Sequence, residues 1–179
     1  MTTPGVSIRR LNIHHTGLYR ALMLRAYSEH ATAYITSFEE RAGRPLEWWQ
    51  RRLADPTSVT LGAFDAADAL IGTARLELYQ RRRERHKVEL VSLYVMKDHA
   101  GRGIGRRLMD DALVEARKWP GVELMLLVVV GENLPALRLF SRLGFVEYGR
   151  EPRAVKHADR SYDKGLFWRP VSADYVGAA

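Results

Sequence analysis

Three glycines at alternate positions, Gly101, Gly103 and Gly105, are the residues whose spacing points most directly to chemistry. They follow the apolar run 88–95 and precede a stretch with helical periodicity. Glycine allows positive φ and a close approach of the backbone to a ligand, and a helix N-terminus carries about half a positive charge. Backbone N–H groups arranged in this way bind phosphate or pyrophosphate. The sequence therefore predicts a phosphorylated cofactor at this turn, with neighbouring arginines adding positive charge.

Two common phosphate-binding motifs do not fit the residues around these glycines. A dinucleotide-binding turn has the form G-x-G-x-x-G, and an acidic residue that binds the ribose ends a strand about 20 residues later. Neither feature is present. The sequence also lacks the G-x-x-x-x-G-K-[ST] of a P-loop. The glycine-rich turn therefore belongs to a different kind of cofactor site.

A second motif lies about 30 residues further along the chain, where residues 133–145 read NLPALRLFSRLGF. Together the two motifs resemble the GNAT acetyltransferases, whose motif A is R/Q-x-x-G-x-G/A and whose later motif is N-x-x-A-x-x-L-[YF]-x-x-x-G-F. Gly103 and Gly105 take the two glycine places of motif A. Ala100 stands where the family usually has Arg or Gln, which is a departure. With weaker similarity upstream, the resemblance covers residues 6–169.

The resemblance implies that acetyl-CoA is the co-substrate and that amides of the glycine-rich loop hold its pyrophosphate. It also implies that amides at the end of the preceding strand bind the pantetheine and polarise the thioester carbonyl. Asn133 either caps a helix only, or caps it and also hydrogen-bonds the pantetheine arm. The residues implied to bind the cofactor are Leu93, Tyr94, Val95, Ala100, Gly101, Arg102, Gly103, Ile104, Gly105, Arg106, Asn133 and Phe140.

Acetyl transfer to an amine needs a group that accepts a proton, because a lysine-like amine has a pKa of about 10.4. In histone-type members of the family a catalytic glutamate occupies the place of Glu89, fourteen residues before Gly103. The resemblance therefore implies that Glu89 is the general base. A solvent-facing strand residue, or one paired with nearby arginines, is the alternative. Strand alternation predicts that Glu89 faces the same layer as Val91, Leu93 and Val95.

Many relatives have a Tyr, placed to protonate the departing sulfur, where this chain has Phe140. Because a thiol has a pKa near 8.5, the thiolate is a tolerable leaving group without an acid. On the acceptor side, the superfamily commonly uses the segment between the first two helices. Here that segment carries Tyr34, Phe38 and Glu39. Acidic residues beside aromatic ones favour a small amine, an amino acid or a peptide N-terminus, whereas exposed residues at a helix start are the alternative.

The composition fits one domain that is long enough, at 179 residues, to bury a core. We expect an N-acetyltransferase domain over residues 1–170 and a tail over residues 171–179. The absence of cysteine excludes disulfides and thiolate metal sites, and we expect no metal. Neither a signal peptide pattern nor an apolar run of membrane-spanning length is present, which favours a cytoplasmic location with no membrane partner.

The net charge of +7 suits an acidic cofactor or an acidic acceptor. Its densest part, residues 80–87 with the sequence QRRRERHK, is typical of a solvated connection between two strands. Since aromatic residues do not interleave with these charges and no nucleic-acid-binding module is recognised, we do not expect a nucleic acid partner. The expected partner is a small-molecule or peptide amine, and a homodimer is compatible with the sequence.

These elements and the resemblance predict one α/β (α+β) domain of GNAT type. Its mixed, mostly antiparallel sheet has about six to seven strands and is flanked by about four helices. We expect an N-acetyltransferase that moves acetyl from acetyl-CoA to a primary amine by direct attack in a ternary complex. A noncatalytic acyl-CoA-binding sensor or regulatory module is the alternative. The strands are expected at 6–11, 59–64, 70–78, 88–95, 122–130, 145–148 and 162–168, and the helices at 15–27, 45–53, 105–119 and 135–143.

Overall fold

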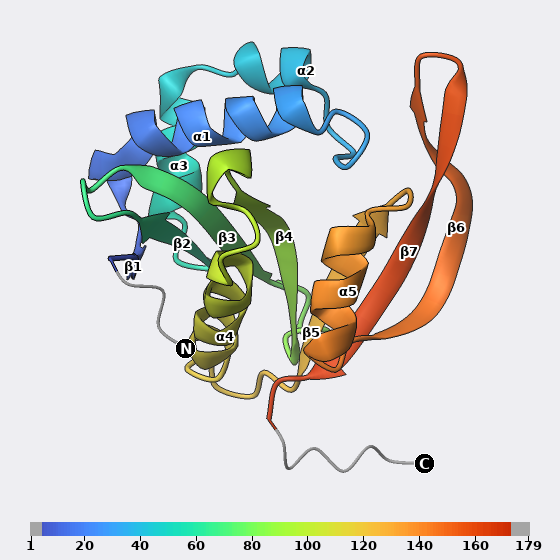
Figure 1. The fold of residues 1–179 in the computed structure, drawn as a ribbon. Helices are drawn as coiled ribbons and strands as arrows, with labels where there is room; N and C mark the ends of the chain where they lie inside the picture. Colours follow the sequence, from blue (N-terminus) through green and yellow to red (C-terminus); the bar gives the residue numbers. More distant parts are fainter. Residues whose placement is uncertain (1–4, 173–179) are drawn as a thin grey trace.

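The computed structural model describes residues 5–172 and contains one open sheet in the strand order β1-β2-β3-β4-β5-β7-β6 (Figure 1). Over these residues β4 and β5 form the parallel pair, and all other neighbouring strands are antiparallel. The predicted sheet is therefore confirmed. The strands are β1 (Ser7–Arg10), β2 (Ser58–Phe64), β3 (Leu70–Leu78), β4 (Lys87–Val95), β5 (Leu124–Val130), β6 (Val146–His157) and β7 (Arg160–Pro170).

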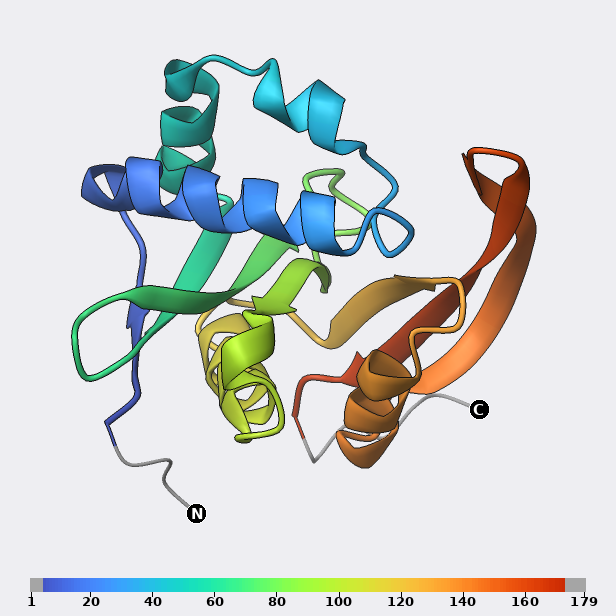
Figure 2. The same cartoon turned by 45° about the horizontal axis from the view of Figure 1, so that its top comes forward.

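Helices cover both faces of the sheet. On one face lie α1 (Thr16–Glu29), α2 (Phe38–Ala42) and α3 (Leu46–Ala54), and on the other lie α4 (Ile104–Ala116) and α5 (Leu134–Arg142) (Figure 2). The short helix α2 was not expected from the sequence. It begins because the Ser37 hydroxyl accepts the Glu40 N–H at 3.2 Å while the Glu40 carboxylate accepts the Ser37 N–H at 2.7 Å.

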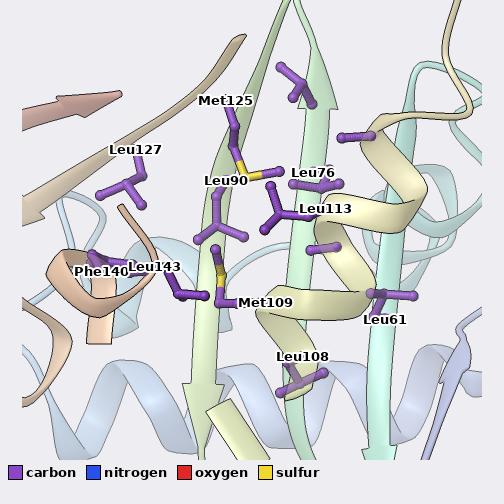
Figure 3. Packing of buried hydrophobic residues seen from close by; sticks show 14 of the residues in the cluster. Leu61, Leu76, Leu90, Leu108, Met109, Leu113, Met125, Leu127, Phe140 and Leu143 are labelled. Carbon is purple, nitrogen blue, oxygen red and sulfur yellow. The ribbon is translucent and has the colours of Figure 1, made fainter. Parts of the chain in front are cut away.

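Two apolar clusters hold these layers together. The larger one packs α4 and α5 against the sheet, with Leu108 and Met109 fully buried at its centre (Figure 3). The smaller one packs α1 and α3 against the opposite face around Tyr19 and Trp49. Val171 belongs to the larger cluster, and its N–H donates to the Glu123 carbonyl at 2.8 Å. The core thus extends one residue past the expected boundary at 170, while positions 173–179 of the expected tail lie outside the described residues.

Strand β4 contains a β-bulge that reverses its alternation. Leu90 pairs with Leu76 in β3 but Ser92 pairs with Arg75, so the extra residue Val91 has no opposite partner. Leu90 packs in the larger cluster and Leu93 packs against the same cluster, although they are three positions apart and regular alternation would place them on opposite faces. The expectation that Glu89 faces the same layer as Leu93 and Val95 is therefore wrong. Glu89 lies on the face that carries α1 and α3.

Beyond the same point β4 and β5 separate. Their ladder runs from Lys87 opposite Leu124 to Leu90 opposite Leu127, although β4 continues to Val95 and β5 to Val130. The two strand ends diverge in Figure 1, where α4 begins beside the end of β4 and α5 follows the end of β5. The predicted cofactor residues of both motifs lie at these two ends.

Strands β6 and β7 form a hairpin whose far half extends beyond the rest of the sheet (Figure 1). Both strands are several residues longer than the sequence predicted. Nearly all of β6 is exposed or half-buried on both faces, so it carries no apolar alternation that would reveal its length. Among the residues that the structure describes, none of the helices is long and apolar enough to cross a membrane.

Candidate active site

The glycine-rich turn has the backbone geometry of an anion-binding loop. Gly101 and Gly103 have φ of +74° and +77°, which strains residues with a side chain. A Cβ atom at either position would meet no atom within 4 Å, so the backbone here borders open space. Gly103 begins α4 without a side-chain cap, and the N–H groups of the first helical turn therefore remain for a ligand.

The third glycine of the motif has a different role. Gly105 lies inside α4, and a Cβ atom there would lie 3.5 Å from Leu139 Cδ2 and 3.9 Å from Val95 Cγ2. A Cβ atom would therefore make ordinary van der Waals contacts here, and the packing of α4 against α5 and the end of β4 does not require a glycine. The expectation of positive φ thus holds for Gly101 and Gly103, while Gly105 has the helical backbone of α4.

The side chains around the loop are mostly engaged in the fold or exposed. Ile104 is 1% exposed and belongs to the core, so only its backbone is available to a ligand. The Arg106 Nε donates to both carboxylate oxygens of Asp110 at 3.0 Å. Ala100 and Arg102 are exposed. The backbone amides are therefore the fixed groups that this loop offers to an anion, and Arg102 is an exposed cation beside them.

The end of β4 presents alternate amides to the gap beside β5. The N–H of Met96 donates to the Ile71 carbonyl of β3 at 2.9 Å. Because N–H groups alternate between the two edges of a strand, those of Leu93 and Val95 point toward the β5 side, away from β3. Tyr94 is directed differently, since its hydroxyl donates to Glu29 Oε2 in α1 at 2.6 Å. Leu93 and Val95 are the better placed of the three predicted strand residues.

Glu89 is half-buried near the start of β4, on the face of α1 and α3. The Tyr79 hydroxyl lies 3.4 Å from Glu89 Oε2, and Glu77 is the direct partner of Glu89 across the ladder. Burial raises the pKa of the Glu89 carboxyl above its usual value, and the charge of Glu77 adds to this, while Tyr79 and Lys164 act in the opposite direction. A raised carboxyl pKa in a half-buried position suits a general base.

The neighbouring carboxylate, Glu77, is neutralised by arginines. Its Oε1 accepts from Arg75 Nε at 2.7 Å and from Arg52 at 3.1 Å. Arg75 is 1% exposed and also donates to Thr60 Oγ1 at 2.8 Å, so this arrangement is fixed in the sheet. Of the two adjacent carboxylates, Glu89 is therefore the one left to accept a proton.

Sequence reasoning missed Arg75, Glu77 and Tyr79, although a signal was present. They occupy every second position along β3 and its extension, and so they share one face. Only the register of the β3–β4 hairpin places that face beside Glu89, and the sequence does not reveal this register.

The segment expected to line the acceptor side lies on the face of the sheet that carries Glu89. Tyr34 packs edge-to-face on Tyr27, with ring centroids 4.8 Å apart. Phe38 and Glu39 begin α2 and are exposed. Hydrogen bonds from its own backbone N–H and from Ser37 lower the pKa of Glu39, and His157 near the tip of the β6–β7 hairpin adds to this. The hairpin tip is thus close enough to α2 for their charges to interact.

The Acetyltransferase (GNAT) family matches residues 23–145, which include β4, the glycine-rich loop, α4 and α5. This chain belongs to the GNAT acetyltransferase family. The resemblance inferred from the two motifs is confirmed. Members of this family are acyltransferases that use acetyl-CoA, whose negative charge suits the N–H groups at the start of α4.

Two curated relatives share part of this GNAT chain. YwnH of Bacillus subtilis (strain 168), named as a candidate phosphinothricin acetyltransferase, is 30% identical over 96 residues, which are 54% of this chain and 58% of YwnH. The L-amino acid N-acyltransferase MnaT of Escherichia coli (strain K12) is 39% identical over 69 residues, which are 38% of this chain and 39% of MnaT. The matched part of the chain thus spans about half the length of these relatives.

Solved structures confirm the GNAT fold. A GNAT-family acetyltransferase from Streptococcus pneumoniae superposes with a TM-score of 0.76 at 21% identity, covering 92% of this chain and 99% of its own. The structure of yncA from Salmonella typhimurium, described with its cofactor acetyl-CoA, gives 0.76 at 22% identity and covers 97% and 98% of the two chains. At such identities the likeness shows the fold alone.

The two side chains of the second GNAT motif have structural roles. The Asn133 Oδ1 accepts the Ala136 N–H at 3.2 Å and caps α5. Phe140 is 5% exposed and meets Phe145 edge-to-face, with ring centroids 5.6 Å apart. Phe140 therefore belongs to the core and has no hydroxyl to offer. Contact of either residue with the cofactor stays a prediction.

Asn133→Ala separates the two roles of the cap. We expect unfolding free energy to fall by about 1 kcal/mol, because an N-cap is lost. We also expect the Kd for acetyl-CoA to rise about three- to tenfold, which is the effect of removing the predicted hydrogen bond to the pantetheine. Denaturant unfolding and calorimetric titration measure the two effects.

Ser37→Ala is the matched control, since it removes the side-chain cap of α2. It should lower stability by a similar amount and leave the acetyl-CoA Kd unchanged. An unchanged Kd in Asn133→Ala would reduce Asn133 to a helix cap.

Proposed function

We propose that this chain transfers the acetyl group of acetyl-CoA to the primary amine of a small acceptor, with Glu89 as the general base. One observation carries the proposal: Glu89 and the uncapped glycine-rich loop lie at the two ends of β4, on either side of the point where β4 separates from β5. This arrangement suits an amine and a thioester that meet at the bulge around Val91. Direct attack in a ternary complex then needs no covalent intermediate on the protein.

Each residue of the proposed site has a separate role in the transfer. Acetyl-CoA, when bound, supplies the thioester whose carbonyl carbon the amine attacks. Glu89 accepts the proton that the amine loses as the C–N bond forms. The N–H groups of Leu93 and Val95 stabilise the negative charge that develops on the carbonyl oxygen. Since Phe140 cannot donate a proton, the sulfur leaves as a thiolate when the C–S bond breaks. The pKa of about 8.5 of the corresponding thiol makes the thiolate a tolerable leaving group.

For the acceptor, we infer an amine that also carries an anionic group, with amino acids as the first candidates. A cavity of about 400 Å³ lies between α3 and the end of β3, next to Glu77. Arg51, Arg52 and Arg75 line it together with Trp48, Asp55 and Glu77. Because Arg52 and Arg75 already pair with Glu77, Arg51 is the guanidinium of this set that suits the carboxylate of an acceptor. Gln80, the first residue of the basic connection 80–87, also lines the cavity, and the side chain of the next residue, Arg81, is 89% exposed. The name of the relative MnaT, an L-amino acid N-acyltransferase, supports the same class.

Thiol release from acetyl-CoA, measured against a matched set of acceptors, tests the proposal. We expect the highest kcat/KM for a free amino acid, a lower value for its amide, and the lowest for an alkylamine of the same length. The amide keeps the amine and removes the carboxylate, so a comparison at equal concentrations of unprotonated amine tests the contribution of the arginines. Tight binding of acetyl-CoA without thiol release for any amine would instead favour an acyl-CoA-binding sensor.

A further inference from the structure

Tyr79 follows the end of β3 and is held firmly in place. Its N–H donates to the Lys87 carbonyl at 3.1 Å, and the Lys87 ammonium lies 4.8 Å from the centre of its ring. Lys87 in turn pairs with Glu84 at 2.9 Å. The backbone and the ring are therefore fixed from two sides. The hydroxyl is left facing Glu89 Oε2 at 3.4 Å.

We propose that Tyr79 is a positioning residue for Glu89, whose hydroxyl orients the carboxylate and favours its ionised form. This inference rests on the proposed function, in which Glu89 accepts the proton of the amine. A distance of 3.4 Å is long for such a bond in the free protein, and catalytic hydrogen bonds commonly shorten when substrate is bound. Tyr79 itself does not touch the reacting atoms, because it lies beyond Glu89 on the side away from the bulge.

The Tyr79 hydroxyl can donate a hydrogen bond at every pH below its own pKa. Burial, followed by the charge of Glu89, raises the pKa of Tyr79 to about 12, with smaller contributions from Tyr148 and Glu84. The phenol therefore keeps its proton below that pH. A neutral donor 3.4 Å away stabilises the carboxylate without introducing a new charge.

The other charged groups around Glu89 leave Tyr79 as its close partner. Glu77 on β3 is already bound by Arg75 and by Arg52 of α3. Lys164 on β7 lowers the Glu89 pKa through its charge, but its ammonium pairs with Glu151 of β6. Glu77 and Lys164 therefore act on Glu89 through their charges. The Tyr79 hydroxyl is the group within hydrogen-bond distance that can fix the direction of the carboxylate.

Tyr79→Phe tests the inference because it removes the hydroxyl and keeps the ring beneath Lys87. Loss of a donor to the carboxylate destabilises the ionised form, so the pKa of Glu89 should rise by about 0.5–1 unit. The carboxylate is the active form, so the acidic limb of the kcat/KM profile should move to higher pH by the same amount. Carbon-13 NMR of the side-chain carboxyls gives the pKa directly in the substrate-free protein, with Glu89→Gln assigning the signal.

Tyr148→Phe is the matched control, since it removes a phenol that influences Tyr79 through charge and is 56% exposed on β6. It should leave the Glu89 pKa and the pH profile unchanged. An unchanged Glu89 pKa in Tyr79→Phe, or an equal shift in both variants, would overturn the inference. Full activity in Glu89→Gln would instead contradict the proposed base, so the two failures are distinguishable.

Discussion

Glu89→Gln is expected to lower kcat at pH 7 by about 10²–10⁴-fold, which is the contribution of a positioned general base. Glutamine keeps the shape of the side chain and its bond with Tyr79, but it cannot accept the proton of the attacking amine. The Kd for acetyl-CoA should stay within about twofold, because Glu89 lies on the opposite face of the sheet from the side chains that pack on α4. Steady-state thiol release and calorimetric titration measure the two quantities.

The loss in Glu89→Gln should shrink as the pH rises. At pH values below the pKa of about 10.4, the neutral fraction of a lysine-like amine rises about tenfold for each unit of increase in pH. The need for a base therefore declines as the pH rises. The unchanged protein should lose activity at low pH, where Glu89 becomes protonated. Burial raises the Glu89 pKa, and activity should fall as the pH drops through a value above that of an ordinary glutamate.

Glu77→Gln is the control for removing a carboxylate from the same face. Because Glu77 is already bound by Arg75 and Arg52, we do not expect it to accept the proton of the amine, and kcat at pH 7 should change only a few-fold. Its loss leaves a buried guanidinium with fewer partners, and the cost should appear as lower stability. Equal loss of kcat in Glu77→Gln and Glu89→Gln would contradict the assignment of the base.

The parts of the site that could be predicted from the sequence depend on local backbone chemistry. Gly101 and Gly103 have positive φ because the turn into α4 requires it, and Asn133 caps α5 as its residue type and position indicated. Such features are fixed within a few residues along the chain. They need no knowledge of which strand lies next to which.

The parts that could not be predicted depend on pairing between strands. The bulge at Val91 is visible only once β3 lies beside β4, because one extra residue is defined by the partner strand. It moves Glu89 to the face opposite the predicted one. The same register brings Tyr79 and Glu77 to Glu89. Alternation along one strand predicts faces correctly only where no bulge interrupts it.

Gly103→Val is expected to raise the Kd for acetyl-CoA by about 10- to 100-fold. With φ of +77° at Gly103, a side chain there costs at least about 1–2 kcal/mol in the present backbone, and a β-branched one costs more. The valine would also project into the open space beside the loop, where the pyrophosphate must approach the amides. The backbone strain moves the N–H groups of the loop away from the geometry that binds an anion, and the side chain blocks the approach of the pyrophosphate.

Gly121→Val distinguishes these two effects. Gly121 has φ of +76° and a Cβ atom there would also meet nothing within 4 Å, but it follows the C-terminal end of α4. The backbone strain is therefore matched, and the fall in unfolding free energy should be similar in both variants. Only Gly103→Val should weaken acetyl-CoA binding, because only that glycine begins a helix whose first N–H groups lack a cap. If the two variants had equal Kd values for acetyl-CoA, backbone strain alone would explain the effect of Gly103→Val on binding. The cofactor would then be bound elsewhere.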